Sequence, residues 1–304
     1  MDVGSGTHAQ QTADAMCKFE NILLKEQPDL VLLYGDTNTT LAGAIVSAKL
    51  QIPIAHIEAG PRTYNRIFPE ETNRILTDHV SDFLFACTSL NVENLAKENI
   101  VTGVHNVGDV MYDLYKKMGG VFSPKKEMRK YNVTEDNYIV TTIHRNTNTD
   151  NKKALESILA GLNTVKSNFG FEVIFPLHPR TKNKIIEFNL DNMLSNLTII
   201  EPLGYLELMS LTQNCAFVIT DSGGYQKESY WAGKRGILVM SQGWQEITDT
   251  GWHVLLGETK DIENADWNKE VNNILQPFEY PANIFGDGHA AEKTVKILSE
   301  YLNS

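Results

Sequence analysis

Short apolar runs alternate with helix-like segments along the whole of this chain, and this alternation constrains the fold more than any other feature. In the first half the apolar runs lie at residues 30–34, 52–57, 83–86 and 105–107, and the segments with helical periodicity lie at residues 12–25, 40–50 and 71–79. Apolar runs of this length between amphipathic helices are typical of buried strands in a parallel sheet. The first half is therefore predicted to be a parallel α/β domain.

A second alternating series predicts a second α/β domain. Its strands are expected at residues 138–142, 172–176, 197–200, 217–220 and 236–239, with helices at residues 151–167, 205–213 and 224–232. The Lys-rich and turn-rich sequence of residues 111–136 is expected to connect the two domains. Because the first half starts with a Gly-Ser-Gly loop and a helix, we expect that domain to lack its opening strand.

The composition narrows the classes of function. With 304 residues, of which 42% are hydrophobic, the chain is long enough for two cores. Its net charge of -11 argues against nucleic-acid binding and against an anionic membrane surface, because both favour basic patches. No apolar run approaches the ~20 residues of a membrane span and no signal-peptide pattern is found, so a cytoplasmic protein is expected. Cys17, Cys87 and Cys215 form no CxxC pair and are interpreted as reduced thiols.

Residues 56–79 place carboxylates and arginines in one short connection between a predicted strand and a helix. Glu58 is expected at the carboxyl end of the strand, where ligands bind in open α/β sheets, and Arg62 follows it. Acidic residues in the first turn of a helix would by themselves explain Glu70 and Glu71. This explanation does not account for Glu58 and Arg62, so a chemical function of the segment is the favoured interpretation.

Two Gly-containing turns after predicted strands are candidates for ligand contacts. In the Ser222-Gly223-Gly224 turn, backbone N–H groups and a hydroxyl can bind phosphate oxygens, and Glu228 one turn later can accept hydrogen bonds from a ribose. An ordinary tight turn is the alternative. Asp36 follows the strand at residues 30–34 in the same way, with helix capping as its alternative.

Two strands of the second half each end in a histidine and an arginine. His144 and Arg145 follow one strand, and His178 and Arg180 follow the next. Arginine supplies charge and histidine supplies protonation or phosphate contact, so the four side chains suit a diphosphate. Metal ligation by the two histidines is possible in principle, but no ligand spacing supports it, and no metal site is predicted.

Together these motifs resemble the non-hydrolysing UDP-N-acetylglucosamine 2-epimerases. The resemblance runs in register over almost the whole chain, and Gly286-Asp287-Gly288 near the end also fits. It is carried by Gly-Asp-Thr-x-Thr-Thr (35–40), His-Ile-Glu-Ala-Gly-x-Arg (56–62), Pro-Glu-Glu-x-Asn-Arg (69–74), His-Arg-x-x-Asn (144–148), His-Pro-Arg-Thr (178–181) and Asp-Ser-Gly-Gly-x-Gln-x-Glu (221–228).

The resemblance implies the GT-B fold, in which two Rossmann-like, doubly wound domains enclose a nucleotide in the cleft between them. The expected boundaries are residues 1–112 for an incomplete N-terminal domain, 113–284 for a UDP-binding domain, and 285–304 for a helix that crosses back to the first domain. The implied substrate is a UDP-sugar, with no metal or nicotinamide cofactor, and a homodimer is expected. Asn65-Arg66 and Gln226-Lys227-Glu228 look closest to the branch that acts on UDP-2,3-diacetamido-2,3-dideoxyglucuronic acid.

Family chemistry, as the resemblance implies it, removes the C2 proton, expels UDP to give a glycal, and re-adds UDP with the proton on the opposite face. By position, Asp36, Glu58 and Glu70 match the family's catalytic acids, and His144 matches its histidine near the diphosphate. The remaining residues are expected to bind the substrate or UDP: Arg62, Arg145, His178, Arg180, Ser222, Gly223, Gly224 and Glu228.

The chain also departs from the family pattern. The usual first strand and its Arg-Pro-Glu turn are not found, so a sizeable N-terminal piece is expected to be missing. Thr147 stands where a carboxylate is usual, Pro61 replaces a leucine, and residues 239–243 replace a loop that commonly reads Arg-Asp-x-Thr-Glu. These departures motivate a second hypothesis, a degraded family member that binds UDP weakly or not at all. A GT-B glycosyltransferase is a third, disfavoured by the Pro-Glu-Glu-x-Asn-Arg segment.

Overall fold

The computed structural model describes residues 6–257 and 259–304 and divides the chain into two compact units. Unit 1 contains the described residues up to Lys116 together with Asn283–Ser304, and unit 2 contains Lys117–Ala282. The first unit is therefore built from both ends of the chain. Among the described residues, none of the helices is long and apolar enough to span a membrane.

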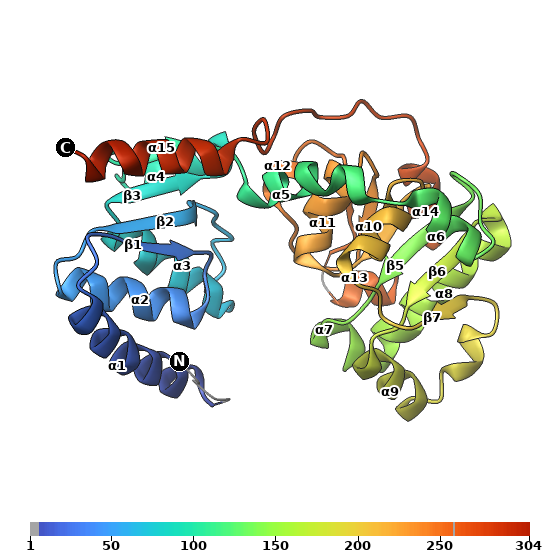
Figure 1. Cartoon of the computed structure of the whole chain (residues 1–304). Helices are drawn as coiled ribbons and strands as arrows, with labels where there is room; N and C mark the ends of the chain where they lie inside the picture. Colours follow the sequence, from blue (N-terminus) through green and yellow to red (C-terminus); the bar gives the residue numbers. More distant parts are fainter. Residues whose placement is uncertain (1–5, 258) are drawn as a thin grey trace. The chain divides into compact units, whose positions relative to one another are not determined.

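Unit 1 has a parallel sheet of four strands in the order β1-β2-β3-β4 (Figure 1). The strands are β1 (Val31–Tyr34), β2 (Ile54–Ala59), β3 (Phe83–Ala86) and β4 (Val104–Asn106). The helices are α1 (His8–Glu26), α2 (Asn38–Lys49), α3 (Pro69–Val80), α4 (Ser89–Lys97), α5 (Val110–Met118), which runs across the boundary between the units, and α15 (Ala290–Leu302). The last helix, α15, belongs to the core of this unit, since Ala290 and Leu298 cluster with Phe85 of β3.

Unit 2 has a parallel sheet of six strands in the order β10-β9-β8-β5-β6-β7. They are β5 (Tyr138–Thr142), β6 (Glu172–Pro176), β7 (Thr198–Ile200), β8 (Val218–Thr220), β9 (Gly236–Leu238) and β10 (Val254–Leu255). Because β6 and β8 flank β5 on opposite sides, the chain order reverses at β5. Such a reversal is a topological switch point. In open α/β sheets, ligands bind in the crevice outside the carboxyl ends of the strands at this point.

The helices of unit 2 begin where the sequence offers caps and first-turn prolines. They are α6 (Pro124–Lys130), α7 (Asn146–Thr149), α8 (Lys152–Phe169), α9 (Pro179–Glu187), α10 (Tyr205–Thr212), α11 (Gly223–Trp231), α12 (Gln245–Thr248), α13 (Thr259–Glu263) and α14 (Trp267–Ile274). For α8, the Asn151 side chain accepts from the Ala154 N–H, and Gly170 ends the helix with φ 77°. A left-handed residue at this position suits glycine, which has no Cβ to clash.

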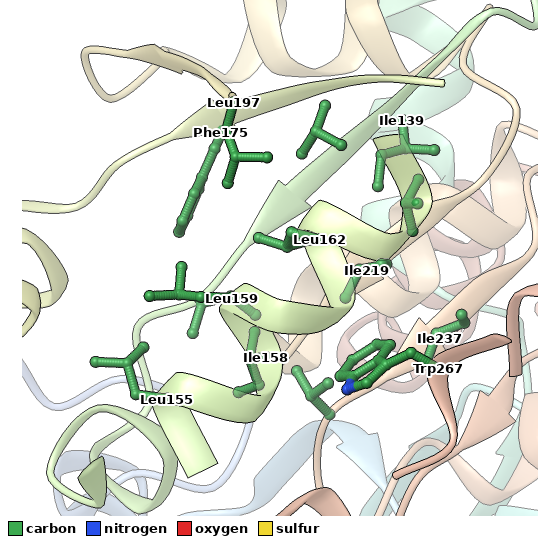
Figure 2. Packing of buried hydrophobic residues seen from close by; sticks show 14 of the residues in the cluster. Ile139, Leu155, Ile158, Leu159, Leu162, Phe175, Leu197, Ile219, Ile237 and Trp267 are labelled. Carbon is green, nitrogen blue, oxygen red and sulfur yellow. The ribbon is translucent and has the colours of Figure 1, made fainter. Parts of the chain in front are cut away.

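The core of unit 2 forms where α8 packs on the sheet (Figure 2). Leu155, Ile158 and Leu162 of α8 are fully buried, together with strand residues such as Ile139 and Ile219. Trp267 of α14 packs against α8 at Gly161. A Cβ added at Gly161 would lie 2.2 Å from the indole ring. The glycine therefore leaves the space that the tryptophan fills.

Two expectations about local structure were wrong. Residues 111–136, expected to be turn-rich, are largely helical: α5, the 3-10 turn Gly119–Val121 and α6 occupy most of them. Short helices with basic residues on their solvent side resemble a polar linker in sequence. The strand β2 also runs to Ala59, past the expected end at residue 57, so Glu58 lies within the strand.

The Gly161 contact yields a prediction about stability. Replacing Gly161 by alanine gains helix propensity of about 1 kcal/mol. The methyl group would overlap the Trp267 ring, and overpacking of this kind costs about 1–3 kcal/mol. We expect a net loss of stability in urea unfolding. The control is Gly120→Ala, where a Cβ meets nothing within 4 Å. A G161A protein more stable than the control would contradict the packing argument.

Candidate functional site

A pocket of about 230 Å³ opens at the carboxyl ends of β5, β6 and β8. We call it the unit 2 pocket. It brings together four of the residues selected from the sequence, since His144 follows β5, His178 follows β6, and Ser222 and Glu228 follow β8. The His144 and His178 rings lie with their centroids 6.4 Å apart. The pocket is lined by Thr142, Ile143, His144, Pro176, His178, Pro202, Leu203, Leu208, Ser222, Tyr225 and Glu228.

The fully buried carboxylate of Asp221 fixes the segment that carries His144 and Arg145. It accepts the backbone N–H of His144 at 3.0 Å and of Arg145 at 2.9 Å, and the Asn148 amide at 3.0 Å. Its Oδ1 also lies 3.2 Å from His144 Nδ1. A buried carboxylate with several N–H donors orients the groups that donate to it. Asp221 was missed as a site residue, although its place just before the Ser-Gly-Gly turn was visible in the sequence.

The start of α11 forms a surface suited to an anion. Ser222 caps the helix, its Oγ accepting the Tyr225 N–H at 3.3 Å. A Cβ on Gly223 would lie 3.3 Å from Arg145 Nη2, which places that guanidinium beside the turn, while a Cβ on Gly224 would meet nothing within 4 Å. Helix N-termini present N–H groups and a positive dipole end to phosphates. The turn therefore combines N–H donors, a hydroxyl and one arginine.

Glu228 is the acidic group of the unit 2 pocket. Burial raises the pKa of its carboxyl, and the charge of neighbouring Lys227 lowers it by a smaller amount. Lys227 Nζ lies 4.2 Å from the centre of the Trp244 ring and 5.9 Å from that of Trp231. Its charge is therefore stabilised by aromatic faces, and the side chain is buried.

His178 and Arg180 lie on the first turn of α9. The His178 Nδ1 accepts the Arg180 backbone N–H at 3.2 Å, so in the neutral ring the proton resides on Nε2. The Arg180 guanidinium donates to Asp150 at 2.7 Å and is not among the groups that line the pocket. The structure thus brings His178 to the pocket, whereas Arg180 is engaged by a neighbouring carboxylate.

In unit 1, Asp36 and Glu58 lie at the ends of neighbouring strands. Asp36 follows β1 and pairs with Arg74 of α3, which also donates to Glu71 at 3.0 Å. The Glu58 carboxylate lies 4.0 Å from the Cβ position of Gly35, the residue before Asp36. Arg74 was not selected from the sequence; it was visible only as part of the Pro-Glu-Glu-x-Asn-Arg segment, and its pairing with Asp36 depends on the fold.

Glu58 has a strained backbone. Its φ is 70°, a left-handed value that is rare for a residue with a side chain, and the pairing of β2 with β3 shifts register between Ile57 and Ala59. Glu58 is therefore the extra residue of a β-bulge. Bulges and left-handed residues occur next to functional sites, where they redirect a side chain at a cost of about 1–3 kcal/mol.

Glu70 and Glu71 differ in their surroundings although they are adjacent. Glu71 is buried and accepts the N–H groups of Thr63 at 3.0 Å and Tyr64 at 2.8 Å, so it fixes the loop before α3. Glu70 is exposed on the first turn of α3. Of this pair, Glu70 is the group that a ligand can reach.

Arg62, for which a UDP contact was expected, is engaged by carboxylates of unit 1. Its side chain is fully buried and donates to Glu98 at 2.7 Å and to Asp78 at 2.7 Å. Burial lowers the pKa of the guanidinium, but the hydrogen bonds and charges of Glu98 and Asp78 outweigh that effect and raise it. Arg62 is therefore assigned a structural role within unit 1, which sequence could not reveal because its partners come from α3 and the end of α4.

Within residues 6–257 and 259–304, no group of three or more His, Cys, Asp or Glu side chains is placed to hold a metal ion.

Two parallel α/β units define a GT-B-like protein, and the fold class predicted from the sequence is confirmed. The family model described as UDP-N-acetylglucosamine 2-epimerase matches residues 1–299. The chain belongs to this family, as its motifs predicted.

Individual relatives agree with this assignment. A UDP-N-acetylglucosamine 2-epimerase homolog of Methanococcus maripaludis is 41% identical over 98% of this chain and 83% of its own length. The UDP-2,3-diacetamido-2,3-dideoxy-D-glucuronate 2-epimerase of Pseudomonas aeruginosa is 38% identical over 99% of this chain and 83% of its own. The crystal structure of Methanocaldococcus jannaschii UDP-GlcNAc 2-epimerase in complex with UDP-GlcNAc and UDP is similar with a TM-score of 0.83 and 37% identity, covering 98% of this chain and 83% of that one.

The raised pKa of Glu228 predicts a pH dependence of stability. A carboxyl whose folded pKa exceeds its unfolded value contributes stability that is fully present below the unfolded pKa and is lost as pH rises through the folded pKa. Glu228→Gln removes this dependence. The stability of E228Q relative to the unmutated protein should therefore increase between pH 4 and pH 8, measured by urea unfolding at each pH. A difference that stays constant or falls over this range would contradict the raised pKa.

Proposed function

We propose that this protein is a UDP-sugar 2-epimerase, which inverts C2 of a UDP-N-acetylhexosamine by eliminating and re-adding UDP. The observation that carries the proposal is the convergence of His144, Ser222 and Glu228 in one pocket at the switch point of unit 2. Family membership and the similarity to a relative whose structure contains UDP-GlcNAc and UDP support it.

The groups of unit 2 match the parts of UDP. The N–H groups at Gly223 and Gly224, with the Arg145 guanidinium beside them, are suited to the diphosphate. The Glu228 carboxylate can accept hydrogen bonds from ribose hydroxyls. Leu203 and Leu208 provide an apolar wall for the base. The Nδ1 atom of His144 faces Asp221, so Nε2 is the ring nitrogen that can hydrogen-bond to the departing phosphate oxygen.

The carboxylates of unit 1 supply the proton chemistry. Inversion at C2 needs one group to take the proton from one face and another to return it from the other face. Asp36, Glu58 and Glu70 are the three candidates, and Arg74 orients the first of them. As C2 loses its proton, the C1–O bond breaks and its electron pair leaves with UDP, so the diphosphate site stabilises the charge that develops.

Within this class we propose the diacetamidouronic acid branch, on the Asn65-Arg66 segment. Arg66 is exposed and offers a cation for the carboxylate of such a sugar. Lys227 gives no further support, because its ammonium group faces the rings of Trp244 and Trp231. Product formation from both UDP-sugars decides the matter: a preference for plain UDP-N-acetylglucosamine would overturn this branch.

The assembly and cellular place of the protein complete the proposal. We propose a cytoplasmic homodimer, as the family resemblance implies. Sedimentation of the purified protein at micromolar concentration should give the mass of two chains, whereas the mass of one chain would overturn the dimer.

The proposed binding of UDP predicts a gain in thermal stability. UDP at ~100 times its dissociation constant should stabilise the protein by roughly 2.7 kcal/mol and raise its thermal midpoint. Ser222→Ala combined with Glu228→Ala should abolish this shift, measured against the midpoint of the same variant without UDP. The exposed pair Ser167→Ala and Glu187→Ala serves as the control and should keep the shift. If UDP leaves the thermal midpoint of the unmutated protein unchanged, the result would favour the hypothesis of a degraded family member.

The proposed roles of the carboxylates predict a loss of turnover when they are replaced. Glu58→Gln and Glu70→Gln should each lower turnover by roughly 100-fold or more, the usual scale for a lost general acid or base, with UDP affinity nearly unchanged. The exposed Glu201→Gln is the control. In deuterated solvent the unmutated protein should place deuterium at C2 of the product. The enzyme proposal fails if neither conversion nor C2 exchange is found with any UDP-N-acetylhexosamine tested.

A further inference from the structure

His56 is fully buried in β2, and both of its ring nitrogens face acceptors. Nε2 lies 2.8 Å from the carbonyl oxygen of Gly35, and Nδ1 lies 2.7 Å from Oδ1 of Asp78. A backbone carbonyl can only accept, so Nε2 carries a proton. An ionised carboxylate also can only accept, so the state of the ring depends on the state of Asp78.

The Asp78 carboxyl group joins His56 to the chain on the far side of Glu58. Its Oδ2 accepts the Gly60 N–H at 3.1 Å and the Arg62 Nη1 at 2.7 Å, while Oδ1 faces His56. The bond between His56 Nδ1 and Asp78 Oδ1 needs one proton and forms whichever of the two atoms carries it.

Charged groups surround this ring. Arg62 donates to Asp78 at 2.7 Å and to Glu98 at 2.7 Å and 2.8 Å. His79 is the other titratable group at the cluster, with Nδ1 3.8 Å from Glu98. A buried charge is tolerated when it is paired and hydrogen-bonded, and this group meets both conditions. We call His56, Gly60, Arg62 and Asp78 the bulge clamp.

The bulge clamp holds the chain on both sides of Glu58. His56 lies two residues before it and Gly60 two residues after it, and both are hydrogen-bonded to the carboxyl group of Asp78. Glu58 between them keeps its left-handed φ of 70°. The other ring nitrogen of His56 bonds the carbonyl of Gly35, next to Asp36. One side chain therefore ties the Glu58 bulge to the loop that carries Asp36.

We propose that His56 is a positioning residue for the epimerase reaction, a buried ring that is hydrogen-bonded at both nitrogens and fixes the Glu58 carboxylate relative to Asp36. This inference rests on the proposed function. His56 lies beneath the strand ends and is buried, so its effect on chemistry is through Glu58 and not through contact with the sugar.

Two neutral replacements test the proposal. The amide of Gln places an N–H donor near the position of Nε2, and that of Asn places one near Nδ1, so H56Q and H56N each keep one of the two hydrogen bonds and lose the other. We expect turnover to fall by about 10–100-fold in both, because small misplacements of a reacting group have effects of this size, while the Kd for UDP changes less than about 2-fold. Leu23→Ala, a buried change in α1, is the control for lost stability and should keep turnover per folded molecule.

Either replacement working at the unmutated rate would overturn the positioning role, and so would an equal loss in the control. A second measurement does not depend on activity. Hydrogen exchange of the Gly60 amide should accelerate in H56Q and H56N but not in L23A. Unchanged Gly60 exchange would overturn the bulge clamp. Absence of turnover in the unmutated protein would instead overturn the proposed function and leave the exchange result to decide the clamp.

Discussion

A buried aspartate that accepts backbone N–H groups organises the strand ends in each unit. In unit 1, Asp78 binds the Gly60 N–H, and in unit 2, Asp221 binds those of His144 and Arg145. A segment leaving a parallel strand has N–H groups that the ladder no longer satisfies, and an unsatisfied buried group costs about 1–3 kcal/mol. By accepting them from one fixed carboxylate, the fold gives a definite shape to the segments that present Glu58 and His144.

The sequence was sufficient for the class of fold and for most candidate positions because both depend on local pattern. Apolar runs between helices indicate parallel sheets, and the ends of such strands converge on one edge, which is why His144, His178 and Ser222 could be grouped in advance. The roles of Arg62, Arg74 and Asp221 could not be read in this way. Each depends on partners that lie distant in the chain, such as Glu98 for Arg62 and Asp36 for Arg74. The bulge at Glu58 likewise requires the pairing of β2 with β3, which a single strand does not specify.

The altered segment at residues 239–243 gains a physical explanation from its neighbours. Trp244 donates from its indole to the carbonyl of Gly223 at 2.9 Å and from its backbone to Gln226 at 3.0 Å. Its ring also faces the ammonium group of Lys227. Where charged side chains are lost from this segment, hydrogen bonds and an aromatic face hold it against the start of α11. The Ser222-Gly223-Gly224 turn is therefore held in place by these interactions.

The return of the chain to unit 1 at its end has a consequence for biosynthesis. Ala290 and Leu298 of α15 share a cluster with Ile57, Phe85 and Val107. A ribosome delivers residues 117–282 in full before α15 is made, so the second unit can complete its core while the first still exposes Phe85. The half of the protein that is made first therefore cannot complete its core until the last helix has been made.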